Sequence, residues 1–169
     1  MKKYNPSETS QKTADLLLEA RLKALSDRPY SLENAGMIGG ISVVNDAAST
    51  SIHKVASSLS AFEKPVVWLM EAEGKFSDMN EFADLISKKT KAVIAVGEDT
   101  DGVYELLWKG NNFFVSAKTW SEALDLALIL GKANDTVLFS PGCPAQEPFE
   151  NYRERGAYFN RLVEMKSKP

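Results

Sequence analysis

The sequence VLFSPGCPAQEPFENYRERGAYFNRLV, at residues 137–163, combines a strand, a loop and a helix, and it decides the fold. Residues 137–139 form a short apolar run that is typical of a buried strand. Turn-forming residues then end this strand, namely Pro141, Gly142, Pro144 and Pro148. Apolar positions spaced by three and four follow and predict a long helix with the inward face Phe149, Tyr152, Gly156, Phe159 and Val163. The opposite face is predicted to meet water through Arg153, Glu154, Asn160 and Glu164.

The composition indicates one globular domain with few special partners. The chain has 169 residues, 44% of them hydrophobic, which is enough to bury roughly two-thirds of its unfolded surface. The net charge is -3 and the sequence contains no basic stripe, so neither nucleic acid nor membrane is expected as a partner. A single cysteine, Cys143, cannot form an intramolecular disulfide, and no signal-peptide or membrane-spanning run follows Met1. We therefore expect a cytoplasmic location. One cysteine and one histidine cannot supply the usual zinc ligands, so no metal site is predicted.

The chain is predicted to divide into an N-terminal extension at residues 1–29 and a main domain at residues 30–169. Within the extension, Thr9 or Ser10 caps a predicted helix over residues 10–25. Its inward stripe is Ala14, Leu17, Leu18 and Leu25.

Strand and helix patterns alternate in the main domain. The dipeptide Gly39-Gly40 is a hairpin signal between strands at 35–38 and 41–45. Further strands are predicted at 66–70, 92–96, 113–116 and 136–139, and helices from residue 52, after residue 78, and at 101–109 and 120–130. Thr119 and Glu122 predict a capping box for the helix at 120–130. The expected fold is a three-layer, Rossmann-like α/β domain with a mostly parallel sheet, an N-terminal hairpin strand and ligands outside the carboxyl ends of the strands.

The run SPGCPAQEPFENYRERG, at residues 140–156, resembles the closing segment of the Mur ligases, most closely the D-glutamate-adding type. The positions that keep the family's spacing are Ser140, Pro141, Phe149, Asn151, Tyr152, Arg155 and Gly156. The resemblance covers residues 30–166 and implies the C-terminal domain of such a ligase, about the last third of the whole enzyme.

A first polar loop, NDAASTS at residues 45–51, lies between a strand and a helix. Asp46 is suited to orient a cation or amine, and Thr50 can donate to an anion beside the helix N-terminus. The alternative is an ordinary helix-capping cluster. The resemblance implies that Asn45 and Asp46 lie near a nucleotide cofactor and that Asp46 and Thr50 contact substrate. Ala48 stands where the family places a charge-neutralising lysine.

A second polar loop, EAEGKFSD at residues 71–78, follows a buried strand. Lys75 is suited to pair a substrate carboxylate, and the alternative is a solvated turn lysine. The resemblance implies that Lys75 binds the carboxylate of the incoming amino acid. The acidic side chains Glu71, Glu73 and Asp78 suggest a metal, but acidic loops are more often solvated, and we favour that interpretation.

The third loop is the opening stretch itself. The resemblance implies a substrate site here, with Ala145 at the family's serine position, Gln146 beside it and Phe149 keeping the aromatic ring. From the residues alone, Cys143 is predicted to be a packed thiol and Arg155 a structural residue that locks the final helix to a carboxylate or to loop carbonyls. Ser140 and Pro141 are expected to shape the strand exit, His53 to lie on the surface, and Trp68, Trp108 and Trp120 to pack.

The function that the resemblance implies is a part in ATP-dependent amino-acid ligation for peptidoglycan precursors. The chain lacks the P-loop sequence GxxxxGK[ST], so we predict no catalytic residue, no cofactor bound by the chain alone, and no activity without a ligase domain supplied in trans. ATP and magnesium enter by resemblance only, and the expected ligand is an amino acid or a UDP-sugar-peptide. Whether the chain is itself an enzyme stays open. The alternative is a non-catalytic interaction module with a decayed pocket, whose helix at 10–25 docks a partner or a second copy. A dinucleotide-dependent enzyme is disfavoured because no GxGxxG follows a strand.

Overall fold

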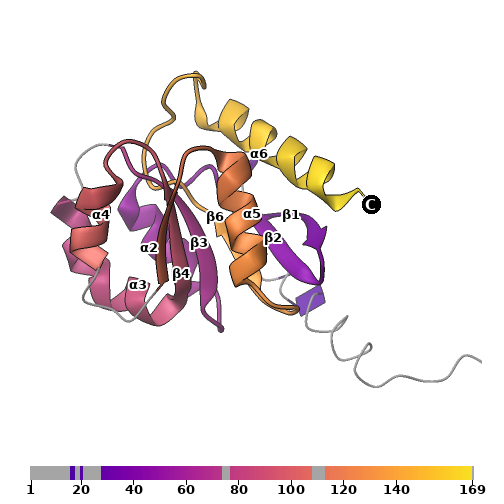
Figure 1. Cartoon of the computed structure of the whole chain (residues 1–169), viewed down its shortest axis with the longest axis horizontal. Helices are drawn as coiled ribbons and strands as arrows, with labels where there is room; N and C mark the ends of the chain where they lie inside the picture. The colour runs from indigo at the N-terminus through magenta and orange to yellow at the C-terminus, as the bar shows by residue number, and fades with distance from the viewer. Residues whose placement is uncertain (1–15, 18–19, 21–27, 74–76, 108–112, 169) are drawn as a thin grey trace, which may run out of the picture.

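The fold is built on one mostly parallel sheet. The computed structural model describes residues 16–17, 20, 28–73, 77–107 and 113–168 (Figure 1). Among these residues, six strands lie in the order β1-β2-β6-β3-β4-β5. Their bounds are β1 Glu33–Ile38, β2 Ile41–Asn45, β3 Val66–Glu71, β4 Thr90–Val96, β5 Phe113–Ala117 and β6 Thr136–Phe139. Only the β1 and β2 pair is antiparallel, so the predicted fold class is confirmed.

The β1 and β2 hairpin follows the Gly39-Gly40 signal. Ile38 pairs with Ile41, and the two glycines between them have φ angles of 58° and 80°, which residues with a Cβ rarely adopt. The first strand begins two residues before the predicted start, because Glu33 and Asn34 also pair with β2 across a bulge near Gly36.

Successive strand residues alternate between two apolar cores, one on each face of the sheet. Val67 and Leu69 of β3 belong to the first core, and Trp68 and Met70 belong to the second. The first core is covered by α5 (Trp120–Leu130) and α6 (Tyr152–Ser167), and the second by α2 (Ile52–Ser60), α3 (Ala83–Lys89) and α4 (Thr100–Leu107). Figure 1 shows these layers, with α5 and α6 set apart from the other helices. None of the helices in the described ranges is both long and apolar enough to cross a bilayer.

The ends of the helices confirm one prediction from the sequence and correct another. As predicted, Thr119 caps α5, since its Oγ1 accepts from the Glu122 amide at 3.1 Å, while the Glu122 carboxylate accepts from Lys118 N at 2.8 Å. The helix predicted after Asp78 is wrong in its first turn, because residues Ser77–Phe82 form a 3-10 helix, η1, before α3 begins.

The predicted start of the final helix is also wrong. Asn151 is its N-cap, with Oδ1 accepting from the amides of Arg153 and Glu154, so α6 begins at Tyr152 and Phe149 lies in the preceding turn. Asn160, predicted to face water, is half-buried because Asn45 Nδ2 donates to its Oδ1 at 2.7 Å.

Several expectations fall outside the described residues. They concern Lys75, Trp108 and all but residues 16–17 and 20 of the helix at 10–25. Leu16 and Leu17 are helical, but Leu17 is 66% exposed, so the prediction that it faces inward is wrong. The boundary between the extension and the main domain stays a prediction.

Candidate functional site

The three polar loops meet at one edge of the sheet. β6 lies between β2 and β3, and all three run parallel, so the loops that follow them leave the same carboxyl edge. Backbone hydrogen bonds join the loops. Gly142 N donates to Ser49 O at 2.9 Å, and Glu71 N donates to Pro141 O at 3.0 Å. The sequence therefore assembles one site from segments that are far apart along the chain.

A cavity of about 260 Å³ opens where these loops meet. Its lining includes Thr50 and Gln146, two of the residues predicted to bind substrate. The remaining lining residues are Ser51, Ile52, His53, Trp68, Met70, Glu73, Asp78, Met79, Pro141, Gly142, Cys143 and Pro144. Glu73 and Asp78 flank the three undescribed residues 74–76, which contain Lys75. Ala145 is half-buried in the loop beside Gln146.

Sequence reasoning placed His53, Glu73 and Asp78 outside the site, as surface or solvated groups. His53 is indeed exposed, with its ring 5.1 Å from that of Phe82, but all three residues line the cavity. Each of them lies in the sequence just after a strand or at the start of the helix that follows a strand. That position could have identified them as residues of the site. The described lining thus carries carboxylates and an imidazole but no lysine or arginine, and it does not by itself match a polyphosphate.

Asn45 and Asp46 have internal partners rather than an open face. Asn45 is buried, donates to Gly156 O at 2.9 Å, and accepts from the Ala47 amide at 3.1 Å. The Asp46 carboxylate accepts from Leu32 N at 3.1 Å and from Ser140 Oγ at 2.7 Å. Burial raises the pKa of the Asp46 carboxyl above its ordinary value, against the opposing effect of its hydrogen bonds. These two side chains fasten the hairpin, β6 and α6 together.

The rest of the first loop is also engaged. Ala48, at the position of the family's lysine, is 8% exposed, and its amide donates to Tyr30 O at 2.9 Å. Ser51 caps α2 by accepting from Lys54 N at 3.4 Å, as the capping interpretation of this loop expected. Thr50 is half-buried at the cavity wall, and its Oγ1 accepts from Lys54 Nζ at 3.4 Å. Of this loop, Thr50 and Ser51 face the cavity.

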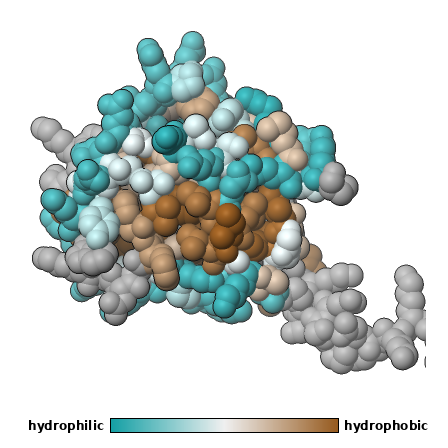
Figure 2. All heavy atoms as spheres, viewed as in Figure 1, coloured by the Kyte–Doolittle hydropathy of each residue, from teal (hydrophilic) through white to brown (hydrophobic). Residues whose placement is uncertain are grey.

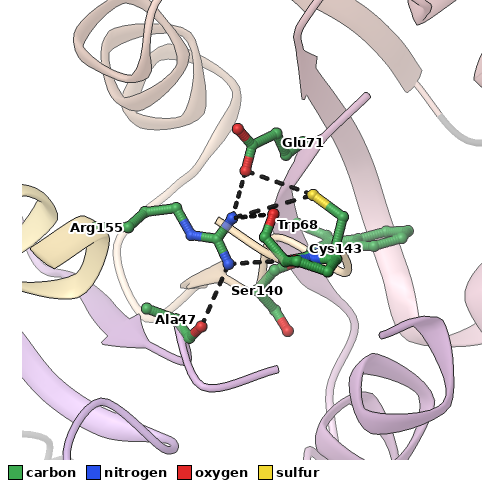
Figure 3. Close-up of polar contacts among 7 residues, drawn as sticks. Ala47, Trp68, Glu71, Ser140, Cys143 and Arg155 are labelled. Carbon is green, nitrogen blue, oxygen red and sulfur yellow. Dashed lines mark hydrogen bonds and ion pairs between the residues drawn. The ribbon is translucent and has the colours of Figure 1, made fainter. Parts of the chain in front are cut away.

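Arg155 holds the three loops together (Figure 3). Its guanidinium is fully buried and donates to the Glu71 carboxylate, to Cys143 O at 2.9 Å, to Pro144 O at 3.3 Å and to Ala47 O at 3.5 Å. The predicted structural role of Arg155 is confirmed. The interpretation of Glu71 as a solvated loop carboxylate is wrong, because Glu71 ends β3 and is 8% exposed. Burial raises the pKa of Glu71, and the charge of Arg155 opposes that rise.

Cys143 and Ser140 complete this buried cluster. The Cys143 thiol donates to Glu71 Oε2 at 3.5 Å, and burial raises its pKa to about 12. The prediction of a packed thiol is therefore confirmed. Ser140 O accepts from Trp68 Nε1 at 2.7 Å, so Ser140 shapes the strand exit as predicted.

The remaining predicted residue, Phe149, packs its ring 5.2 Å from that of Tyr158 on the side of the first core. It is not among the residues that line the cavity. Across the described residues, no group of three His, Cys, Asp or Glu side chains is arranged to hold a metal ion.

Comparison with known proteins identifies the relatives of this chain. No family model matches it. It is 33% identical over 138 residues to the UDP-N-acetylmuramoylalanine–D-glutamate ligase of Aquifex aeolicus, across 81% of this chain and 33% of that protein. It is 34% identical over 148 residues to the enzyme of the same name from Chlamydia pneumoniae, across 86% of this chain and 35% of that protein.

A solved structure supports the fold. The UDP-N-acetylmuramate-alanine ligase of Thermotoga maritima matches with a TM-score of 0.50 and 13% identity, across 80% of this chain and 30% of that one. The chain spans about a third of the length of the curated relatives it matches. Over most of its length the chain is homologous to one part, about a third, of the UDP-N-acetylmuramoylalanine–D-glutamate ligases.

Proposed function

We propose that this domain provides the amino-acid-binding edge of a ligase that extends peptidoglycan precursors. The observation that carries the proposal is the cavity at the carboxyl ends of β2, β3 and β6, which Thr50 and Gln146 line together with Glu73 and Asp78. An amino acid presents a carboxylate and an amine. The Glu73 and Asp78 carboxylates of the lining suit the amine, and we assign the ligand carboxylate to Lys75, which lies between them in the sequence.

In this proposal the chain's own residues bind and orient the amino acid, and other domains of the ligase activate the second substrate. Thr50 donates its hydroxyl to the ligand carboxylate, and the Arg155 cluster holds the loops rigid around the ligand. ATP with magnesium, bound by a separate ligase domain, would supply the phosphoryl group that activates the carboxylate of the acyl substrate. The described lining offers no lysine or arginine for its phosphates, so we assign no step of that chemistry to these residues. The UDP-sugar-peptide substrate, the partner domain in trans and the cytoplasmic location remain part of the proposal.

Calorimetric titration of the purified chain with D-glutamate, L-amino acids, ADP, and ATP with magnesium tests this proposal. Heat from an amino acid that is lost in both Lys75→Ala and Thr50→Val supports it. The matched control is Lys64→Ala. Lys64 is exposed just before β3, at the amino ends of the strands and away from the cavity, so its replacement should leave the binding heat unchanged. Binding that persists in both Lys75→Ala and Thr50→Val would show that the amino acid does not bind at the carboxyl ends of the strands.

A second candidate function is favoured by the first loop. The polar groups of Asn45 and Asp46 have internal partners, and Ala48 replaces the family's lysine, as expected for a domain that keeps the fold and has lost part of its ligand contacts. The domain would then act as a non-catalytic interaction module. No heat from any of the titrated ligands, with a fully folded chain, would favour this function over the first.

A further inference from the structure

The two edges of the sheet differ in how they are protected against pairing with another strand. At one edge, β1 carries a bulge near Gly36 and the exposed, charged Glu33, two features that discourage pairing. At the other edge, β5 has the sequence FFVSA, without a charge or a bulge, and it is paired only on its β4 side among the described residues. An apolar, unguarded edge strand is a template for a further strand.

An apolar surface continues from this edge onto α5. Residues of α5 that face the sheet are buried, but Ile129 on the outer side is 76% exposed, and Leu126 and Leu130 beside it are only half-buried. On β5, Phe113 is 69% exposed and pairs with Ala92 of the first core, so it lies on the same face of the sheet as α5. Figure 2 shows apolar residues gathered in one patch in the middle of this face, where Figure 1 places α5 and β5. Exposed patches of this kind mark association surfaces.

We propose that a second copy of this chain covers the surface, with β5 pairing antiparallel to the β5 of the partner copy across a two-fold axis. The strand is self-complementary. A register centred on Val115 places Phe114 opposite Ser116, and Phe113 opposite Ala117. No charged side chain of β5 opposes another. The same two-fold axis brings the exposed rows of the two α5 helices, with Ile129, toward each other above the joined sheet.

The point at which the chain enters the domain argues against the N-terminal extension as the occupant. The chain enters the domain beside α6, where a Cβ on Gly156 would lie 2.5 Å from the Tyr30 ring. α6 covers β1 and β2, at the far edge of the sheet from β5. A second copy instead presents the same apolar strand and helix that the open edge requires.

Light scattering of the full chain after size exclusion, over a wide range of concentrations, tests the proposal. The expected mass is twice the 18.6 kDa of one chain, falling to a single chain in Phe113→Lys and Ile129→Lys. Both positions are exposed, so the domain should stay folded, as circular dichroism checks. Met37→Lys is the matched control, because Met37 is an exposed apolar residue on β1, at the opposite edge, and the dimer should persist there.

Three results would overturn the proposal. They are a single-chain mass at every concentration, a dimer that persists in the Phe113→Lys/Ile129→Lys double variant, and a dimer lost when residues 1–27 are deleted. The last result would assign the contact to the extension. If one lysine variant fails to fold, the other still decides the outcome.

Discussion

Nη1 of Arg155 lies 2.5 Å from Oε2 of Glu71, and both side chains are buried where α6 meets the end of β3. The two residues are 84 positions apart, so this ion pair closes a long stretch of chain. Removing one member of a buried ion pair leaves the other as an unpaired, desolvated charge, which lowers the free energy of unfolding. The pair therefore fixes the geometry of the candidate site through the loop carbonyls that Arg155 also binds.

Replacing one member of this pair should destabilise the fold strongly. We expect Arg155→Met to lower the free energy of unfolding by about 3–5 kcal/mol, because Glu71 keeps its burial and loses its partner. The double variant Arg155→Met/Glu71→Met should recover most of that loss. Urea unfolding followed by tryptophan fluorescence measures both. Lys166→Met, which breaks the exposed pair with Asp125, is the control and should cost less than about 1 kcal/mol. Equal losses in Arg155→Met and Lys166→Met would contradict this account.

The buried Asp46 should make stability depend on pH in a defined direction. Burial raises the pKa of Asp46 above the ordinary value of 3.8, so the folded chain holds this proton more tightly than the unfolded chain. The resulting stabilisation is complete below the ordinary value and is lost as pH rises through the raised pKa. The free energy of unfolding of the wild type, minus that of Asp46→Asn, should therefore fall as pH rises above the ordinary value of 3.8.

Asp135 provides the control of opposite sign. Its partial burial acts to raise the pKa, but hydrogen bonds from Lys91 and Lys132, with their charges, lower it below the ordinary value. The stability difference between the wild type and Asp135→Asn should therefore fall as pH decreases toward acid. The same slope for both aspartates would show that the environment of Asp46 is misassigned.

Cys143 should resist thiol reagents in the folded chain. With the pKa raised to about 12, roughly one thiol in ten thousand is ionised at pH 8, and burial restricts access further. In urea the pKa returns toward about 8.5, so labelling by a disulfide reagent should become at least roughly a thousandfold faster. Stopped-flow labelling with and without urea measures the ratio. Rapid labelling of the native chain would show that the thiol is not enclosed.

Gly156 should tolerate no side chain while Tyr30 is present. A Cβ at this position would lie 2.5 Å from Cγ of Tyr30, so Gly156→Ala forces α6 and the entry of the chain apart. We expect a loss of about 1–3 kcal/mol in the free energy of unfolding. Most of that loss should vanish when the substitution is made in a Tyr30→Ala background. A double-mutant cycle by thermal or urea unfolding gives the coupling, and additive effects would exclude this contact as the cause.

The inner strands of the sheet could be predicted closely because they are buried on both faces. β2 and β6 have their predicted bounds, and the others extend by one or two residues. Continuous apolar runs between turn signals mark such strands clearly. The start of α6 was placed too early, because Phe149 continues the apolar spacing of the helix although Asn151 provides the cap.

The candidate site could be predicted only in part. Its place at the strand ends and the roles of Arg155 and Cys143 follow from the sequence, but the burial of Glu71 does not, because a carboxylate in an acidic loop gives no sign of a partner on α6. The internal hydrogen bonds of Asp46 likewise come from Leu32 and Ser140, on two other segments. Polar groups of this kind take their role from the tertiary structure.

The place of β6 in the sheet has a consequence for how the chain matures during synthesis. β6 is the last strand to leave the ribosome, yet it joins β2 to β3, and no other strand connects the two halves of the described sheet. Until residues 136–139 emerge, no strand joins the β1 and β2 hairpin to β3, β4 and β5, and the strand edges that β6 will cover stay unpaired. The two parts of the sheet can therefore be joined only after residues 136–139 have left the ribosome, which is late in the synthesis of this domain.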